Sequence, residues 1–234
     1  MTDESWAVCR DCKVGRHAVY GEVDPDEVCR RRDLVLSVKA GQHVVRAGEQ
    51  TTHIHTIHSG WAFRYSLLAD GRRQILEFLL PGDMITIESL LGCANPDRFH
   101  VRALTDLVLC AFTPAAMEAI APLGDTQHHG LRRGLCQHMA MQDRRLVNIG
   151  RRKASGRLAQ LILELSDKLS ERGLADARAF ECPIRREHLA DALGLTSAHV
   201  NRTIAEFGRK GLLAIDDRIV RILNRDALRK IAED

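Results

Sequence analysis

The chain has 234 residues, of which 45% are hydrophobic and 28% are charged. This composition is ordinary for a globular protein and excludes a disordered or collagen-like chain. The net charge of +3 is unevenly distributed. Residues 1–125 hold 13 basic and 17 acidic side chains, a net charge of −4, whereas residues 126–234 hold 21 and 14, a net charge of +7. The length suits one or two domains, and the asymmetry indicates two parts with different tasks.

The sequence lacks the signals of a membrane or secreted protein. No apolar run approaches the roughly 18 residues that a membrane span needs, and Met1–Arg10 lacks the order of a signal peptide. We therefore expect a cytoplasmic protein with no membrane partner. The reducing cytoplasm argues against structural disulfides, so any clustering of the seven cysteines, at positions 9, 12, 29, 93, 110, 136 and 182, points to metal or redox chemistry.

Residues 34–112 alternate short apolar runs with turn signals. Asp70-Gly71 separates two such runs, as in a hairpin, and Pro81-Gly82-Asp83 ends the second of them. Regular short strands without intervening helices favour a sandwich or a barrel. The N-terminal half is therefore predicted to be a small β domain.

The periodicity changes to that of helices after Pro114. Five positions step by 4, 3, 4 and 3 residues, which is the seam spacing of a pairing helix: Leu135, Met139, Gln142, Leu146 and Ile149. This spacing favours dimerisation, although a lone apolar stripe can equally be the core face of a surface helix. A second amphipathic helix follows from Leu158 and is expected to end near Gly173.

Residues 185–207 carry the most specific pattern in the chain. Residues 187–193 form one short predicted helix, Gly194 stands where the chain must turn, and Thr196 caps a second helix. Ala190 is small where two helices would cross, and Val200 would fill the wedge between them. This is the spacing of a helix-turn-helix. The alternative interpretation is an ordinary helical hairpin with a polar outer face.

The outer face of the second helix carries residue types that read DNA bases. Arg can pair with guanine, Asn with adenine, and Ser or Thr with bases or phosphates. The pattern of residues 212–222 predicts a β-hairpin, and hence a winged helix-turn-helix. Further basic side chains are expected to contact the DNA phosphates. The predicted DNA contacts are Thr196, Ser197, Ala198, His199, Asn201, Arg202, Thr203, Arg185, Arg186, Lys210 and Arg218.

With a β domain, a long helix and a winged helix-turn-helix in that order, the chain resembles the Crp/Fnr family of bacterial transcription regulators. The turns of the family's β-roll match Gly60, Gly71-Arg72, Gln74 and Pro81-Gly82-Asp83. Residues 189–196 resemble the family's helix-turn-helix motif. Arg202 matches a base-contacting position of the family, whereas Ala198 and Asn201 depart from it and leave the half-site sequence open. The resemblance implies a homodimer on double-stranded DNA with a palindromic operator, and contact with RNA polymerase if the protein is an activator.

The resemblance also implies the fold class and a domain plan. The expected fold is α+β, with an N-terminal β-roll like a cyclic-nucleotide-binding domain, a long dimerisation helix and a C-terminal winged helix-turn-helix. The expected parts are a cysteine-containing segment at 1–30, the β-roll sensor at 31–124, the dimerisation helix at 125–150, the DNA-binding domain at 151–224 and a tail at 225–234.

The signal that reaches the β-roll is less defined, and oxygen, redox state or a small molecule all stay open. Family members that bind cyclic AMP use a Gly-Glu-Leu segment and an Arg-Ser or Arg-Thr pair, but the matching stretches here read Ile87-Glu88-Ser89 and Asp97-Arg98. A carboxylate would therefore meet the cyclic phosphate, which argues against cyclic AMP.

The cysteines instead resemble the oxygen-sensing Fnr branch, whose members hold a [4Fe-4S] cluster on four cysteines. Thiolates suit such clusters. The resemblance implies the ligand set Cys9, Cys12, Cys29 and Cys110, but Tyr20 stands where a third N-terminal cysteine is expected. Cys29 from an unusual distance, or a non-cysteine ligand, could complete the site. The alternative is that Cys9 and Cys12 are relics, Cys110 is a core thiol and no metal binds.

Other chemistry is weakly supported. His53, His55 and His58 lie close together, and on a strand His53 and His55 would share a face, but such pairs are usually solvated. No nucleophile elbow, phosphate-binding Gly loop or zinc-protease helix is present, so we do not expect an enzyme. The alternative function is a ligand-gated effector or enzyme module without DNA-binding activity.

Overall fold

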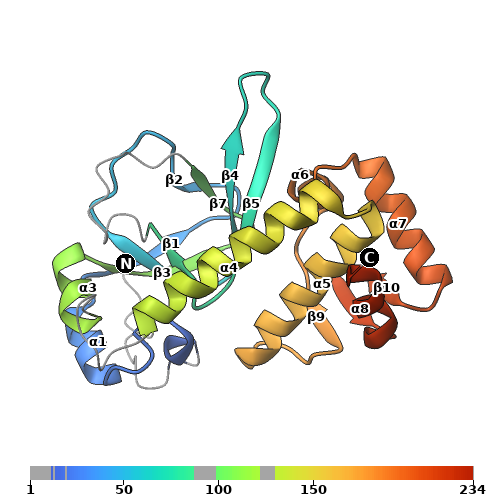
Figure 1. Cartoon of the computed structure of the whole chain (residues 1–234). Helices are drawn as coiled ribbons and strands as arrows, with labels where there is room; N and C mark the ends of the chain where they lie inside the picture. The colour runs from blue at the N-terminus through green and yellow to red at the C-terminus, as the bar shows by residue number, and fades with distance from the viewer. Residues whose placement is uncertain (1–11, 13, 19, 87–98, 122–129, 234) are drawn as a thin grey trace. The chain divides into compact units, whose positions relative to one another are not determined.

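The computed structural model describes residue 12 and residues 14–18, 20–86, 99–121 and 130–233 of the chain (Figure 1). Two compact units are distinguished. The N-terminal unit comprises residues 1–72 and 76–138, and the C-terminal unit comprises residues 73–75 and 139–234. Across the described residues, no helix is long and apolar enough to cross a lipid bilayer.

The N-terminal unit is built from two four-stranded sheets. One has the strand order β1-β8-β3-β6 and the other has the order β2-β7-β4-β5. Strand β8 pairs antiparallel with both β1 and β3. The short strands confirm the predicted β domain: β1 (Leu34–Val38), β2 (His43–Val45), β3 (Ile54–Ser59), β4 (Ala62–Leu67), β5 (Arg73–Leu79), β6 (Met84–Ile85), β7 (His100–Ala103) and β8 (Leu107–Phe112).

The core of this unit lies between the two sheets. It takes Ile57 and Leu109 from one sheet and Ala62 and Val101 from the other, all of them at most 3% exposed. Alternation along each strand sends these side chains to the inner face. Gly60 closes the β3–β4 turn with a φ of +88°, and a Cβ there would lie 2.1 Å from the carbonyl oxygen of Asp106. Only glycine fits that turn.

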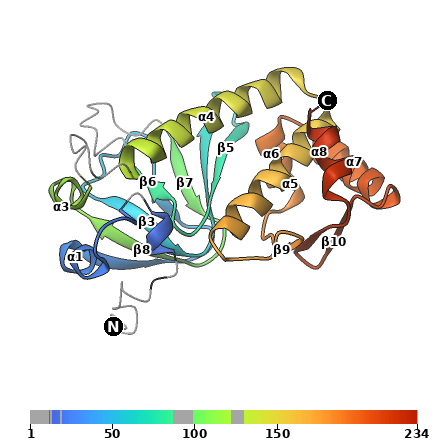
Figure 2. The ribbon, with the colours of Figure 1, turned by 60° about the horizontal axis from the view of Figure 1, so that its bottom comes forward.

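A second apolar cluster covers the outer face of the β1-β8-β3-β6 sheet. Helices α1 (Pro25–Arg31) and α3 (Pro114–Ile120) pack there (Figure 2). The cluster joins Ile54 and Phe112 of the sheet to Val28 of α1 and Met117 of α3. Tyr20, in place of the expected cysteine, is 6% exposed and its ring centroid lies 5.3 Å from that of Phe112. Tyr20 is therefore a core residue.

Two long helices follow the β domain. Helix α4 (Gly130–Arg151) contains the predicted seam, and residues 125–129 of the predicted dimerisation segment lie outside the described residues. Helix α5 (Ala154–Glu171) carries nine buried residues, among them Leu158 and Ile162. It ends two residues before Gly173, whose φ is +65°, as the pattern predicted.

The rest of the C-terminal unit packs on α5. Helices α6 (Arg186–Leu193) and α7 (Ser197–Arg209) are followed by a three-stranded sheet of order β10-β11-β9. Its strands are β9 (Ala179–Glu181), β10 (Leu213–Asp216) and β11 (Ile219–Ile222).

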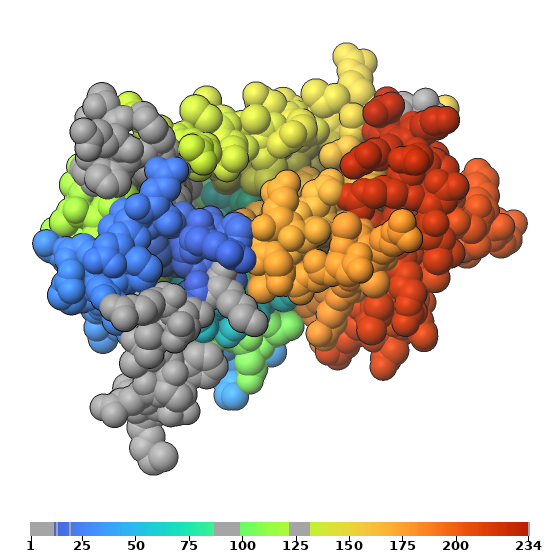
Figure 3. All heavy atoms as spheres, turned by 90° about the horizontal axis from the view of Figure 1, so that it is seen from below, coloured from blue at the N-terminus to red at the C-terminus, as the bar shows by residue number. Residues whose placement is uncertain are grey.

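The prediction of a C-terminal tail at residues 225–234 is wrong. Residues Arg225–Glu233 form helix α8, which packs on α5 through the fully buried Leu228. The end of the chain is drawn in red in the space-filling view (Figure 3). Residues 225–233 carry apolar side chains at positions 228, 231 and 232. This spacing is typical of a helix, so the sequence does carry a signal for α8.

Candidate functional site

Helices α6 and α7 are joined by a tight turn at Gly194. Gly194 has φ +64° and ψ 40°, a left-handed conformation that glycine adopts without steric cost. The amide of Leu195 donates to the carbonyl of Ala190 at 3.0 Å and so ends α6. Thr196 begins α7, because its side chain accepts a hydrogen bond from the amide of His199 at 3.2 Å. Val200 is fully buried beneath the turn.

The first turns of α7 present a polar surface to solvent. The exposed residues there are Thr196, Ser197, Ala198, His199, Asn201 and Arg202. The prediction that Thr203 also faces outward is wrong. Its side chain is 5% exposed, and its hydroxyl donates to the carbonyl of His199 at 3.0 Å. A 3.6-residue turn places position 203 beside Val200 on the inner face.

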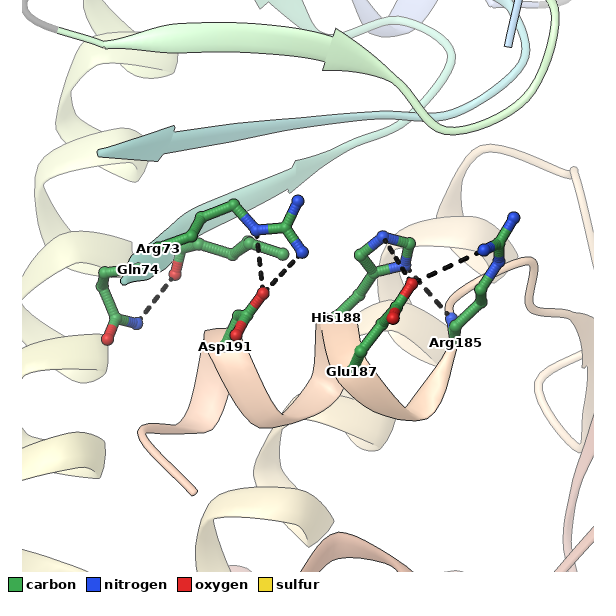
Figure 4. A network of polar contacts seen from close by, with 7 residues as sticks. Arg73, Gln74, Arg185, Glu187, His188 and Asp191 are labelled. Carbon is green, nitrogen blue, oxygen red and sulfur yellow. Dashed lines mark hydrogen bonds and ion pairs between the residues drawn. The ribbon is translucent and has the colours of Figure 1, made fainter. Parts of the chain in front are cut away.

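Polar contacts hold α6 in place (Figure 4). The amide of Arg185 donates to Nδ1 of the buried His188 at 3.3 Å, which satisfies a donor at the start of the helix. Burial lowers the pKa of His188, and the Arg73 charge lowers it further, so the neutral acceptor form is favoured. Residues 73–75 belong to the C-terminal unit, and Arg73 donates to Asp191 from Nε and Nη2 at 2.8 and 2.5 Å.

The predicted phosphate contacts differ in their surroundings. Arg185 and Lys210 are exposed and have acidic neighbours: Arg185 lies 3.5 Å from Glu187, and Lys210 lies 2.6 Å from Glu206. Arg186 is partly buried, which lowers its pKa. Arg218 is exposed in the turn of the β10–β11 hairpin.

That hairpin turn has an unusual backbone. Asp217 and Arg218 have φ values of +39° and +74°. Positive φ at both central residues is the conformation that matches the twist of a two-residue hairpin. The predicted hairpin is therefore present, and its turn carries Arg218 to the surface.

The seam of α4 is largely exposed in the single chain. Met139 is 67% exposed, Leu146 is 75% exposed and Ile149 is 37% exposed, while Leu135 and Gln142 are partly buried. Large apolar side chains at seam spacing are costly to leave in water. The helix therefore offers an apolar stripe to a partner.

Three cysteines gather near one end of strand β3. The Sγ of Cys12 lies 3.5 Å from Nδ1 of His58. Burial tends to raise the pKa of Cys12, but its hydrogen bond to His58 and the charge of His58 outweigh burial and lower it. Burial raises the pKa of Cys110, and the nearby thiols of Cys12 and Cys29 raise it further, whereas Arg32 lowers it. Cys110 therefore lies near both Cys12 and Cys29.

The donor set fits an iron–sulfur group in its chemistry. It combines three thiols with an imidazole, and Cys9 of the predicted set lies outside the described residues. The hydroxyl of Thr56, on the residue paired with Cys110 across the sheet, is buried without a hydrogen-bond partner. An orphaned donor of this kind suits a thiolate or sulfide acceptor. Within the part of the chain that the structure describes, no three His, Cys, Asp or Glu side chains surround a single ion.

The remaining described cysteines do not join this group. Cys182 is buried in the C-terminal unit, where burial raises its pKa to about 11. Cys136 is exposed on α4. All the described cysteines are free thiols, and Cys93 lies outside the described residues.

Comparison with known proteins identifies both halves of the chain. Residues 35–121 match the family described as cyclic nucleotide-binding domain, and residues 156–231 match the Crp-like helix-turn-helix domain. The chain belongs to the Crp/Fnr family. Accordingly, this Crp/Fnr protein is a DNA-binding transcription regulator, as the helix-turn-helix pattern predicted. Its relatives are regulators rather than enzymes.

Named relatives of this Crp/Fnr regulator extend over most of its length. The transcriptional activator protein FnrL of Cereibacter sphaeroides is 28% identical and covers 90% of this chain and 85% of its own. The fumarate and nitrate reduction regulatory protein of Escherichia coli K12 is 22% identical over 96% of this chain and 90% of its own. The solved structure of FixK2 from Bradyrhizobium japonicum has a TM-score of 0.74 at 26% identity, covering 85% and 96% of the two chains.

The match to a cyclic nucleotide-binding domain concerns the fold. The stretches that argue against cyclic AMP, Ile87-Glu88-Ser89 and Asp97-Arg98, lie outside the described residues. That expectation about the ligand therefore stays a prediction for this Crp/Fnr regulator.

Two features of the N-terminal unit were not predicted as parts of one site. His58 was considered only with His53 and His55, whereas the structure places it against Cys12, which lies 46 residues earlier. His58 follows Thr56 by two positions on β3, so alternation along the strand places both side chains on the same face. The orphaned hydroxyl of Thr56 has no signal in the sequence at all, because its burial depends on the packing of the sheet.

Proposed function

We propose that this regulator acts as a homodimer whose two α7 helices read the two halves of a palindromic operator, and that its N-terminal unit senses oxygen or redox state. The main support for the proposal is the exposed polar face of α7. Gly194 makes the turn before this helix, and Thr196 caps its first turn. A helix of about this size enters the major groove with its N-terminal residues toward the bases. We expect the protein to act in the cytoplasm, where it would bind double-stranded DNA.

The proposed base contacts come from the first two turns of α7. Arg202 would pair with guanine through two hydrogen bonds and Asn201 with adenine. The exposed Thr196, Ser197 and His199 would contact bases or phosphates, and Ala198 a thymine methyl. Thr203 is left out because its hydroxyl is already bonded within the helix. Arg185, Arg186, Lys210 and Arg218 would contact phosphates, which gives salt-dependent affinity without sequence choice.

The proposed dimer uses the stripe on α4. Two copies that pair through Leu135, Met139, Gln142, Leu146 and Ile149 would bury apolar surface that is exposed in one chain. A two-fold dimer presents the same surface from both subunits, so one helix suffices. The signal would shift the two reading helices relative to each other through this helix, as a rigid-body two-state change. If the protein is an activator, RNA polymerase is a further partner.

The proposed sensor is an iron–sulfur group on the thiols of the N-terminal unit. Cys110 lies near Cys12 and Cys29, and Cys9 stands in the same Cys-x-x-Cys pair as Cys12. When bound, such a group supplies a reaction with oxygen that ordinary side chains lack. Burial raises the pKa of Cys110, and the nearby Arg32 guanidinium opposes this rise by favouring the thiolate.

Two measurements test the proposal. Protein purified without air is titrated with salt against genomic DNA fragments, with the expectation that a subset of fragments stays bound at salt concentrations that release the rest. Failure to select any fragment would favour the alternative effector module. The same preparation is scanned for absorbance: a broad visible band that bleaches in air supports the sensor, whereas a colourless, iron-free protein contradicts it.

A further inference from the structure

One arginine side chain of the C-terminal unit joins the ends of two helices. Arg157 is the fourth residue of α5 and is partly buried. Its Nε donates to the carbonyl of Arg152, the first residue after α4, at 2.9 Å. Its Nη1 donates to the carbonyl of Leu193, the last residue of α6, at 3.0 Å. A single guanidinium therefore links the end of α4, which carries the seam, to the first helix of the helix-turn-helix.

The position of this cation is unfavourable for its own helix. A positive charge in the first turn of α5 lies beside the partial positive charge of the helix N-terminus. The carbonyls at the C-terminal ends of α4 and α6 carry partial negative charge and lack partners within their helices. Arg157 donates to both ends, so its favourable interactions lie with α4 and α6 rather than with α5. Residues that break a local rule in this way are expected at functional sites.

The carbonyl of Leu193 belongs to the residue directly before the turn that leads into the reading helix. Gly194 makes that turn in its left-handed conformation, and α7 starts three residues later. A Cβ built at Gly194 would lie 3.7 Å from Nη1 of Arg157 and 3.8 Å from Cγ2 of Ile149. The last residue of the predicted seam and the guanidinium of Arg157 therefore both lie beside the turn that sets the direction of α7.

A second contact fixes α4 against the same residue. Asn148 of α4 is 7% exposed, and its Nδ2 lies 3.5 Å from the carbonyl oxygen of Arg157. The backbone and the side chain of Arg157 thus both contact the last turn of α4. A guanidinium donates in fixed, planar directions, whereas a lysine ammonium is a flexible point charge. Two carbonyls bonded to one guanidinium are therefore held in a fixed relation to each other.

We infer that Arg157 is a positioning residue that fixes the direction of α7 relative to α4, and that it thereby sets which spacing of operator half-sites the dimer accepts. The inference rests on the proposed dimer and its palindromic operator, and it assigns the choice of spacing to a residue outside the reading face. One extra base pair moves a half-site by about 3.4 Å along the DNA axis and by about 34° around it. Two reading helices in a fixed relation cannot follow that movement.

The test compares the affinity of the full chain for three DNA duplexes. The first is the palindrome that the wild type selects from a random library, the second has one extra base pair between the half-sites, and the third keeps a single half-site. The extra base pair should lower wild-type affinity by about 10- to 100-fold, because the dimer can no longer engage both half-sites. In R157K and R157Q, affinity for the palindrome should fall about tenfold and the spacing penalty should shrink to about threefold, because the two readers are no longer preorganised. Affinity for the single half-site should stay within about twofold, since the reading face is unchanged.

The matched control is R152Q. The side chain of Arg152 donates to Gln160 at 3.2 Å, so this variant removes the same charge from the same joint but keeps the carbonyl that Arg157 contacts. R152Q should keep the wild-type spacing penalty. An equal shrinkage in R152Q would assign the effect to lost charge and overturn the inference. Sedimentation velocity and circular dichroism check that each variant is dimeric and folded.

The remaining outcomes separate this inference from the proposed function. If R157K binds the single half-site normally and keeps the full spacing penalty, the inference is wrong while the proposed function stands. If R157K and R157Q lose as much affinity for the single half-site as for the palindrome, Arg157 only supports the folding of the helix-turn-helix, and the inference is again wrong. A wild type that shows no spacing penalty contradicts the proposed two-fold reading itself.

Discussion

The guanidinium of Arg64 lies 3.6 Å from the carboxylate of Glu77, and the two side chains are 15% and 5% exposed. Nδ1 of His138 lies 3.9 Å from the same carboxylate. The three residues belong to the N-terminal unit, where β4 and β5 meet the first part of α4. A buried charge of this kind is tolerated only while its partner stays in place.

Replacing Glu77 by Gln should therefore destabilise the N-terminal unit. The change keeps the shape of the side chain but removes the carboxylate charge beside the buried Arg64 cation, at a cost of about 3 kcal/mol. Urea unfolding followed by circular dichroism measures the loss. E118Q, at an exposed site on α3, is the control, and an equal stability of the two variants would contradict the role of the pair.

Arg202→Ala should lower affinity for the cognate operator by about 1–3 kcal/mol and relax the choice at one base pair. Arg202 is exposed on the presented face of α7, so its loss removes a contact without disturbing the fold. Lys210→Ala should instead weaken binding to all sequences alike and flatten the salt dependence. Binding assays on cognate and random duplexes measure both, and an equal loss on the two duplexes for Arg202→Ala would exclude base reading.

Leu146→Glu should convert the proposed dimer to monomers. Leu146 is 75% exposed in the single chain, so the substitution spares the fold but places a charge in the paired seam. Sedimentation velocity measures the oligomeric state. Q137E, an exposed position on α4 outside the seam, should remain dimeric. A dimer that survives Leu146→Glu removes this seam from the interface.

Gly194→Ala should destabilise the C-terminal unit by about 1 kcal/mol, because a side chain is strained at its φ of +64°. Space is not the problem, since an added Cβ would come no closer than 3.7 Å to its neighbours. Gly208→Ala is the matched control: Gly208 lies within α7, where an added Cβ would lie 3.8 Å from the Leu213 carbonyl, so alanine should stabilise the unit by about 0.5–1 kcal/mol. Thermal unfolding should move in opposite directions for the two variants.

His55 should make the N-terminal unit sensitive to acid. Burial lowers its pKa to about 4, against about 6.5 in an unfolded chain. The unfolded chain thus takes up the proton first, so stability falls as the pH drops from about 6.5 toward 4, by roughly 3 kcal/mol in total. Urea unfolding at several pH values should show a shallower fall for H55L than for the wild type. The exposed His199, replaced in H199L, serves as the control, and parallel curves for wild type and H55L would contradict the assignment.

The order of elements and the reading motif follow from the sequence because they depend on local spacing. The alternation in residues 34–112, the seam step in α4 and the sequence Gly194-Leu195-Thr196 each act within a few residues, so the pattern alone predicts the β domain, the helix and the turn. The sequence predicts less well which side of a helix each residue occupies. Thr203 follows Asn201 and Arg202 directly, but its position around α7 turns its hydroxyl inward.

Contacts between distant residues were decided by the tertiary structure alone. Cys12 and His58 are 46 positions apart and come into contact because the N-terminal segment packs against strand β3. Neither spacing nor composition predicts that contact. Likewise, Tyr20 fills a core position where a cysteine was expected, and Leu228 of α8 is buried where that helix packs on α5. The sequence by itself determined that this chain binds DNA, because the helix-turn-helix is a local motif. Only the tertiary structure decided which side chains surround the thiols of the proposed sensor, because folding of the sheet brings residues together that are distant in sequence.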